Sequence, residues 1–173
     1  MRLATRFLVV AVPAAAALML ACGSRDGSSG SGPLTLEQYF QQLGAIDKTS
    51  QARFERIGQQ LSEQQPPEQA LSTIKDVYPE EVATLQDLLD GMERLRPPAE
   101  VKNEHDAAVD ALRTSVKVTE KNAKSIASAT LFSQVTDRLN SQESTGASKK
   151  TSDTCLALEK AGTDRGLTVD LNC

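Results

Sequence analysis

The sequence contains no tryptophan and few aromatic residues of any kind, with two Tyr and four Phe among its 173 residues. Carbohydrate-binding platforms and surfaces that stack single-stranded nucleic acid both need aromatic faces, so this composition argues against both. Histidine occurs only once. The hydrophobic core must therefore be built from Leu, Ile, Val and Ala.

Basic residues are in the minority as well, with 19 Lys and Arg against 23 Asp and Glu and a net charge of −4. A nucleic-acid surface would need clustered basic residues, and this balance also argues against adhesion to anionic lipid by charge. The sequence has no Gly-rich phosphate loop, no serine in a nucleophile elbow, and no acid paired with a base on the predicted inner faces. We therefore predict no catalytic residue, no cofactor and no enzymatic activity.

The N-terminal stretch has a different character from the rest of the chain. Arg2 and Arg6 precede an apolar run over residues 7–21, broken only by Pro13, and Cys22 follows. This is the layout of a secretory signal. Its ending, LMLAC, resembles the lipobox of bacterial lipoprotein precursors, although Met and Leu stand where Leu and a small residue are commonest.

The resemblance implies that a signal peptide, residues 1–21, is removed and that Cys22 carries lipid (diacylglycerol and palmitate). The protein would then be anchored in the cell membrane or outer membrane and face the extracytoplasmic side of the cell envelope. An ordinary cleaved signal and a transmembrane helix are the alternatives, although a bilayer-spanning helix needs about 20 apolar residues. Removal of the leader takes two Arg and no acid with it, so the net charge of −4 becomes −6.

The cysteine count points to one disulfide. Disulfides form and persist outside the cytoplasm, and an odd count normally leaves a free thiol. The chain has three cysteines. If Cys22 carries lipid, Cys155 and Cys173 remain, and we expect them to pair.

Residues 22–33 form a Gly/Ser-rich tether after the lipid site, and such composition gives a flexible linker. A helical domain is predicted over 34–173. Apolar residues recur at steps of three and four over 35–64, 67–95 and 98–140, which is the helix period. Thr35 is placed to cap the first helix, and the Pro-Pro pairs at 66–67 and 97–98 separate the three.

Two of the predicted helices carry an internal ambiguity. Pro79 lies inside the second, where it either bends the helix or starts a new one with Glu80 and Glu81 in its first turn. A third helix over 98–140 would be about 64 Å long at about 1.5 Å per residue. Because the other two are shorter, it either overhangs them or bends in the Ser/Thr-rich stretch 125–136.

The C-terminal part is predicted as a polar loop over 141–150, a short helix over 153–160 and an extended tail over 166–171. The fold class is therefore all-α, an antiparallel bundle of three long helices plus a short disulfide-tied C-terminal helix and an extended tail. The segment LRPPAEVKNEHDAAVDAL and the cysteine-bounded tail resemble features of small helical envelope lipoproteins of uncharacterised function. That resemblance assigns no activity.

His105 is the candidate for a metal or cofactor ligand. It lies on the apolar stripe, whereas Glu104 and Asp106 point about 100° away on either side. Lys102 stands where a Glu-x-x-His metal motif would need Glu, and one histidine cannot build a two-histidine zinc site. We predict a buried structural histidine and no metal site; the alternative is a haem or metal ligand with Met92 as axial partner.

Taken together, the sequence predicts a membrane-anchored interaction or scaffolding module whose partner is an envelope protein or the cell wall. The alternative is a carrier of a small ligand, haem or metal that uses His105. An exposed apolar patch would favour the first, an apolar pocket containing His105 the second, and buried paired carboxylates an enzyme. The acids at positions 80, 81, 87, 90 and 93 are predicted to form a solvated helix face.

Overall fold

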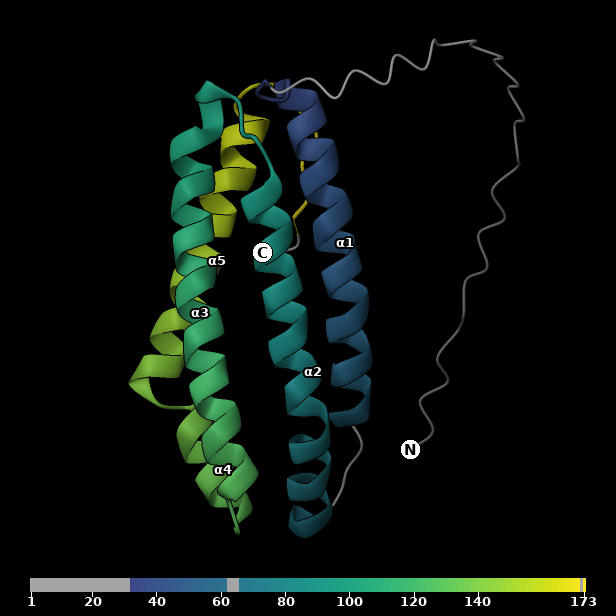
Figure 1. The fold of residues 1–173 in the computed structure, drawn as a ribbon, viewed down its shortest axis with the longest axis vertical. Coiled ribbons are helices and arrows are strands. Elements are labelled where there is room, and N and C mark those ends of the chain that lie inside the picture. Colours follow the sequence, from purple (N-terminus) through teal and green to yellow (C-terminus); the bar gives the residue numbers. More distant parts are fainter. Residues whose placement is uncertain (1–31, 62–65, 172) are drawn as a thin grey trace, which may run out of the picture. The chain divides into compact units, whose positions relative to one another are not determined.

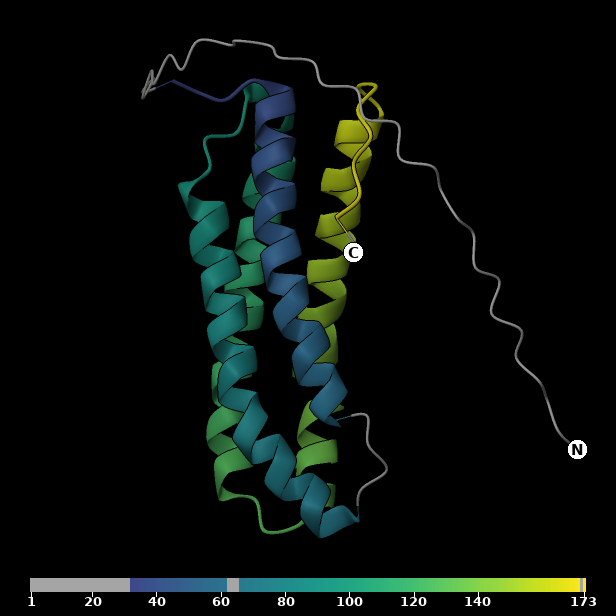
Figure 2. The same ribbon diagram turned by 90° about the vertical axis from the view of Figure 1, so that its right-hand side faces the viewer.

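The computed structural model describes residues 32–61, 66–171 and 173. These residues are all-α and contain no strand, so the predicted fold class is confirmed. The elements are α1 (Leu36–Leu61), α2 (Pro67–Arg94), the 3-10 turn η1 (Ala99–Val101), α3 (Lys102–Ser128), α4 (Phe132–Leu139) and α5 (Gln142–Thr163). Consecutive long helices run in opposite directions, side by side (Figures 1 and 2). In place of three long helices and a short one, the described residues form four long helices and the short α4.

The predicted signal peptide, the lipid site Cys22 and the tether as far as Ser31 lie outside the described residues. These features therefore stay predictions from the sequence. Within the part of the chain that the structure describes, no helix combines the length and the apolar character needed to cross a bilayer.

Helix α1 begins at the predicted cap. The Thr35 hydroxyl accepts a hydrogen bond from the backbone N–H of Gln38 at 3.2 Å, and Oε1 of Gln38 accepts one from the N–H of Thr35 at 3.1 Å. This reciprocal capping box satisfies two N–H groups that an uncapped helix would leave unpaired. The helix predicted over 35–64 is confirmed as far as Leu61, and residues 62–64 lie outside the described residues.

Helix α2 continues through Pro79, so the new helix start that the acids at 80 and 81 favoured is wrong, and the bend is the correct interpretation. Proline lacks an N–H and clashes with the preceding turn, which bends a helix without ending it when packing on both sides is favourable. The N-terminal part of α2 is inclined to the rest of the helix (Figure 2). Tyr78, directly before the proline, is buried and holds this part of α2 against the bundle.

The continuous helix predicted over 98–140 is wrong, because α3 ends at Ser128 and α4 begins at Phe132. The bend expected in the Ser/Thr-rich stretch is therefore the correct alternative. The hydroxyls of Ser125 and Ser128 bond back to helix carbonyls, and such bonds compete with the helix. Oε1 of Gln134 then accepts the N–H groups of Thr130 and Leu131, which caps the start of α4.

The polar loop predicted over 141–150 is also wrong, since α5 is helical from Gln142 onward and absorbs the short helix predicted over 153–160. Ser141 caps α5 by accepting a hydrogen bond from the N–H of Ser144. Hydroxyl groups, rather than an apolar stripe, tie this half of α5 to α3: Thr151 bonds Ser115 at 2.8 Å. Because its inner face is polar, this half of α5 shows no apolar period in the sequence.

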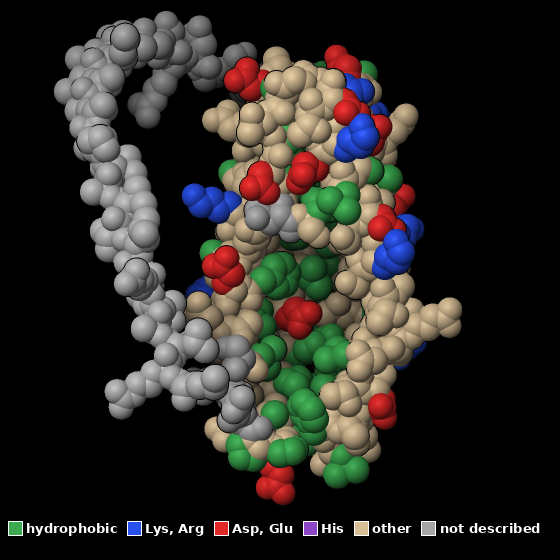
Figure 3. Space-filling view, turned by 180° about the vertical axis from the view of Figure 1, so that it is seen from behind, with side chains coloured by type: hydrophobic (Ala, Val, Ile, Leu, Met, Phe, Trp, Pro, Cys, Tyr) green, Lys and Arg blue, Asp and Glu red, His purple; other side chains and the backbone are tan. Residues whose placement is uncertain are grey.

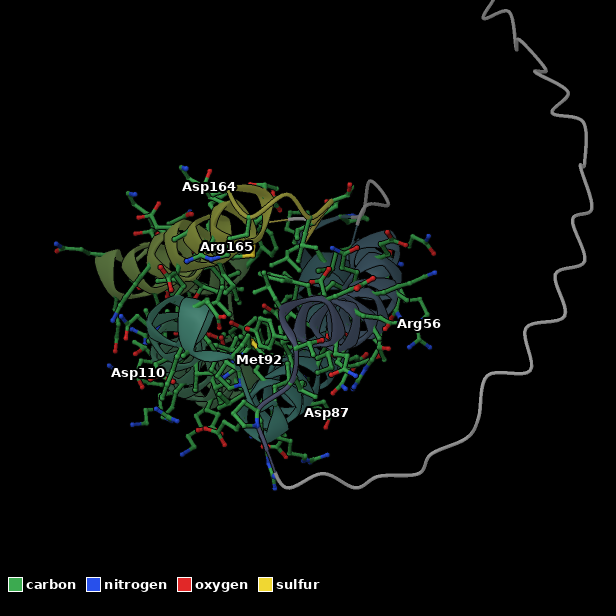
Figure 4. All side chains as sticks on the ribbon, turned by 90° about the horizontal axis from the view of Figure 1, so that it is seen from above. Arg56, Asp87, Met92, Asp110, Asp164 and Arg165 are labelled. Carbon is green, nitrogen blue, oxygen red and sulfur yellow. A yellow bond between two sulfur atoms is a disulfide. The ribbon has the colours of Figure 1, made fainter. Side chains whose placement is uncertain are left out.

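The buried side chains form two clusters along the bundle. The larger one includes Tyr39, Met92, Leu112 and Leu158, and the smaller one is centred on Tyr78, Ile126 and Val135. Viewed along the bundle, Met92 points into the interior, whereas Arg56, Asp87, Asp110 and Asp164 lie at its outer surface (Figure 4).

Candidate functional site

One side of the bundle is not closed by direct helix packing. Helix α1 packs on α2, α2 on α3 and α3 on α5, whereas α1 and α5 do not pack closely on each other over the described residues. The face shown in Figure 3 is hollowed, and hydrophobic side chains gather in the hollow with an acidic side chain among them. The side between α1 and α5 is therefore where another segment can enter the bundle.

The chain's own C-terminal tail, residues 167–171 followed by Cys173, fills part of this side. Gly166 adopts a φ of 84°, a conformation that favours glycine, and turns the chain back along α5. Val169 then packs at Gly162, where an added Cβ would lie 2.6 Å from a Val169 methyl group and 2.8 Å from the ring of Phe40 on α1. The tail is thus wedged between α1 and α5, and Leu171 is buried there.

The tail is extended, as predicted. Val169 lies against Gly162, and Cys173 is joined to Cys155 in the expected disulfide, with Cα atoms 5.6 Å apart. The tail thus runs alongside α5 from Gly162 to Cys155. The disulfide fixes the end of the tail to the middle of α5.

Polar side chains of α5 bind the backbone of the tail. A carboxylate oxygen of Glu159 accepts the N–H of Leu171 at 3.0 Å, and the hydroxyl of Ser152 donates to the carbonyl of Cys173 at 3.1 Å. An extended segment has no internal hydrogen bonds, so these bonds replace the ones its backbone would make with water. Helix α5 therefore supplies polar side chains that bind the backbone of an extended chain lying alongside it.

Beyond the tail, the open side continues as a cleft of about 450 Å³, which we call the α1–α5 cleft. Leu171 and Cys173 form one end of it, and α1, α2, α3, α4 and α5 all contribute to its walls. Its apolar lining consists mainly of Phe54, Leu85, Leu88, Val118 and Leu139. Sites for small molecules and peptide side chains have volumes of this order, an apolar lining and a few polar groups.

The charged groups of the cleft are carboxylates. Glu81 and Asp47 line it, and no Lys or Arg is among the residues that do. Asp47 accepts a hydrogen bond from Gln51, whereas Glu81 has no ion-pair or hydrogen-bond partner in the described residues. Burial raises the pKa of the Glu81 carboxyl above its ordinary value. The cleft is therefore acidic, with one carboxylate that no cation of the described residues neutralises.

The floor of the cleft also contains an amide with an unsatisfied end. Asn122 is 2% exposed, and its Nδ2 donates to the hydroxyl of Ser144 at 3.0 Å, but its Oδ1 has no partner in the described residues. If Oδ1 and Nδ2 of Asn122 were exchanged, the NH₂ group would instead be the end without enough hydrogen-bond partners. The nearby Tyr78 hydroxyl has its pKa raised by burial, an effect that the Asn122 amide opposes. Buried polar atoms are rarely left unpaired.

His105 lies away from the cleft. It is 4% exposed, and its Nδ1 is 2.9 Å from the hydroxyl of Tyr39, whose ring meets the imidazole edge-on at 5.6 Å. Burial lowers the pKa of His105. Neither the cleft nor the two other cavities beside it is lined by His105. Among the described residues no group of three or more His, Cys, Asp or Glu side chains is placed to hold a metal ion.

Glu81 is the residue whose environment was predicted incorrectly. With Glu80 it was assigned to a solvated helix face, yet Glu80 lies 3.8 Å from Arg56 at the surface while Glu81 lines the cleft. The sequence spacing already indicated that Glu81 faces inward, because Tyr78, Glu81 and Leu85 follow one another at steps of three and four. An acid on the apolar stripe of a helix faces the interior rather than solvent.

Comparison with other proteins adds no relative to this geometry. No protein-family model matches the chain, and neither the curated proteins nor the solved structures include one that matches it significantly.

Proposed function

We propose that this protein is a lipid-anchored envelope protein that binds a partner without catalysing a reaction, and that the α1–α5 cleft is its binding site. The observation that carries this proposal is the open side of the bundle, where apolar side chains of five helices line a cleft beside α1 and α5. An apolar surface that a bundle leaves unburied costs stability and marks an interaction site in many proteins.

The chemistry of the cleft suits binding. Its polar groups are Ser, Thr, Asn, Gln and Tyr side chains and two carboxylates, and one of these carboxylates already accepts a hydrogen bond from Gln51. Such groups can orient a ligand through hydrogen bonds. The predicted anchor at Cys22 and the Gly/Ser tether would hold the domain near the membrane, which raises its effective concentration against an envelope partner.

The carrier alternative rests on His105. Its Nδ1 is engaged by Tyr39, and its side chain does not line any of the three cavities described above. The partner-binding proposal therefore has the more specific structural support, because its site and its residues can be named.

The test is a steric block with a matched control. Ser148 and Ala157 are both exposed residues of α5, nine positions apart and so on opposite sides of the helix, but only Ser148 lines the cleft. In anchored protein purified from its own membrane, Ser148→Trp is expected to lose the proteins that the wild type retains, and Ala157→Trp to keep them. Equal recovery with both variants would contradict the proposal.

A further inference from the structure

The tail shows what kind of segment fits between α1 and α5. It enters this side as a single extended strand, with Leu171 and Val169 packed inward and its backbone bound by side chains of α5. The α1–α5 cleft begins where the tail ends, since Leu171 and Cys173 are part of its lining. A second extended segment can therefore occupy the cleft in line with the tail.

Helix α5 carries further hydroxyl groups along this line. Ser152, which binds the carbonyl of Cys173, is followed at intervals of four residues by Ser148 and Ser144, and all three line the cleft. Four helical residues rise about 6.0 Å, close to the roughly 6.6 Å between alternate residues of an extended chain. Ser148 makes no side-chain hydrogen bond in the described residues, so its hydroxyl is the next one free to bind a backbone group.

The charge of the cleft indicates a second property of the segment that binds there, namely the charge of its side chains. Asp47 and Glu81 are the charged residues of the lining, Glu81 has no ion-pair partner among the residues that the structure describes, and none of those lining the cleft is Lys or Arg. A Lys or Arg side chain entering the cleft would pair with Glu81 in a charge-assisted hydrogen bond.

We infer that the α1–α5 cleft binds an extended peptide segment of a partner protein, with apolar side chains at alternate positions and a Lys or Arg that pairs with Glu81. This inference rests on the proposed function of the cleft as a binding site. The apolar side chains would lie on Leu85, Leu88 and Val118, and the hydroxyl of Ser148 would bind the peptide backbone. The recognition mode resembles strand addition, with helix side chains in place of a sheet edge.

The experiment selects peptides on the full lipid-anchored chain held in nanodiscs. Random dodecapeptides are displayed, selected on the wild type, and counter-selected on Ser148→Trp. Enriched sequences are expected to repeat apolar residues with a period of two and to carry Lys or Arg at one fixed position. Binding of the synthetic peptides is then measured by fluorescence anisotropy.

The variants Glu81→Gln and Glu80→Gln form the matched pair, because the two residues are adjacent and only Glu81 lines the cleft. Glu81→Gln is expected to weaken binding by about tenfold or more, the usual effect of losing a hydrogen bond to a charged group, and Glu80→Gln to leave it unchanged. Enriched peptides with the three-to-four spacing of a helix, no enrichment over the Ser148→Trp background, or binding indifferent to Glu81→Gln would overturn the inference. Self-association that Ser148→Trp abolishes would also overturn it, because the occupant would then be a second copy.

These outcomes are separable from failure of the proposed function. If the peptide results are negative while Ser148→Trp still removes the native partner, the cleft remains the binding site and only the class of ligand is wrong. If the native partner is retained by Ser148→Trp, the proposed function itself fails.

Discussion

The hydroxyl of Tyr39 on α1 lies 2.9 Å from Nδ1 of His105 on α3, inside the larger core cluster. The bond joins α1 to α3 through two residues that are 66 positions apart in the chain. In the neutral imidazole with its proton on Nε2, Tyr39 donates and Nδ1 accepts. Protonation of His105 would remove this acceptor and place a charge in the core.

The first prediction follows from this pair. Burial lowers the pKa of His105, the Asp106 charge opposes that shift and the Lys102 charge adds to it. The unfolded chain therefore binds the proton more tightly, so stability is full above the unfolded-state pKa of about 6.5 and falls as the pH drops below it. Urea unfolding between pH 5 and 8 should show this loss in the wild type and a weaker one in His105→Gln.

Tyr39→Phe provides the control for this prediction. It keeps the imidazole and leaves Nδ1 unpaired, which costs about 1–3 kcal/mol, but the loss of stability on acidification should remain. A wild type whose stability is flat across pH 5–8 would contradict the buried, neutral histidine.

The second prediction concerns the stability that the protein loses by burying the carboxyl group of Glu81 in the cleft. Because burial raises the pKa of Glu81 from its ordinary 4.5, the folded state binds the proton more tightly, and stability falls as the pH rises above about 4.5. Glu81→Gln should therefore raise the free energy of unfolding at pH 7 by roughly 0.5–2 kcal/mol, in the range of other stabilising substitutions.

Glu80→Gln is the matched control, and it should change stability little because Glu80 and Arg56 form a surface ion pair. A variant that gains stability while it loses binding would show that Glu81 is kept for function. If Glu81→Gln is instead destabilised in thermal unfolding at pH 7, then Glu81 has a structural role that the cleft geometry does not show.

The third prediction tests the seating of the tail. Gly162→Ala would place a methyl group within 2.9 Å of both Val169 and Phe40, and overpacking of this kind costs about 1–3 kcal/mol. Gly146, also on α5, has no atom within 4 Å of an added Cβ, so Gly146→Ala should stabilise the helix by up to about 1 kcal/mol. Thermal unfolding of the two variants compares them directly, and equal shifts would mean that the tail does not lie at Gly162.

The fourth prediction concerns the anchor inferred from the leader. Cys22→Ser should release the protein from the membrane, because acyl chains contribute about 0.8 kcal/mol per buried CH₂ and the described helices include none that could span a bilayer. Intact-mass analysis of the membrane-extracted wild type should show lipid on Cys22. Unmodified mature wild type in the soluble fraction would refute the lipoprotein assignment.

Helices α1 and α2 and the course of α3 as far as Ser128 could be predicted from the sequence, because their inner faces are aliphatic and their starts carry strong signals. Thr35 and Gln38 form a capping box that the residue order already indicates, and the Pro-Pro pairs mark the corners. Pro79 left two alternatives open, since the sequence does not record how well the helix packs on either side of it.

The N-terminal half of α5 and the cleft could not be predicted, for a shared reason. The N-terminal half of α5 is rich in Ser, Thr and Lys, and its inner hydroxyls bond α3 through pairs such as Thr151 with Ser115. Polar contacts of this kind leave no apolar period to detect. Without α5 in place, nothing in the sequence indicated that one side of the bundle stays open, although the position of Glu81 on the apolar stripe of α2 already placed it toward the interior.

The most direct test of the central claim is site-specific photocrosslinking in intact cells. A photoreactive amino acid at Ser148 reports on the cleft, and the same amino acid at Ala157 reports on the opposite side of α5. The account predicts a discrete crosslinked product from position 148 that is absent from position 157 and weakened by Glu81→Gln. Crosslinks of equal yield and identity from both positions, or none from position 148 in correctly anchored protein, would contradict it.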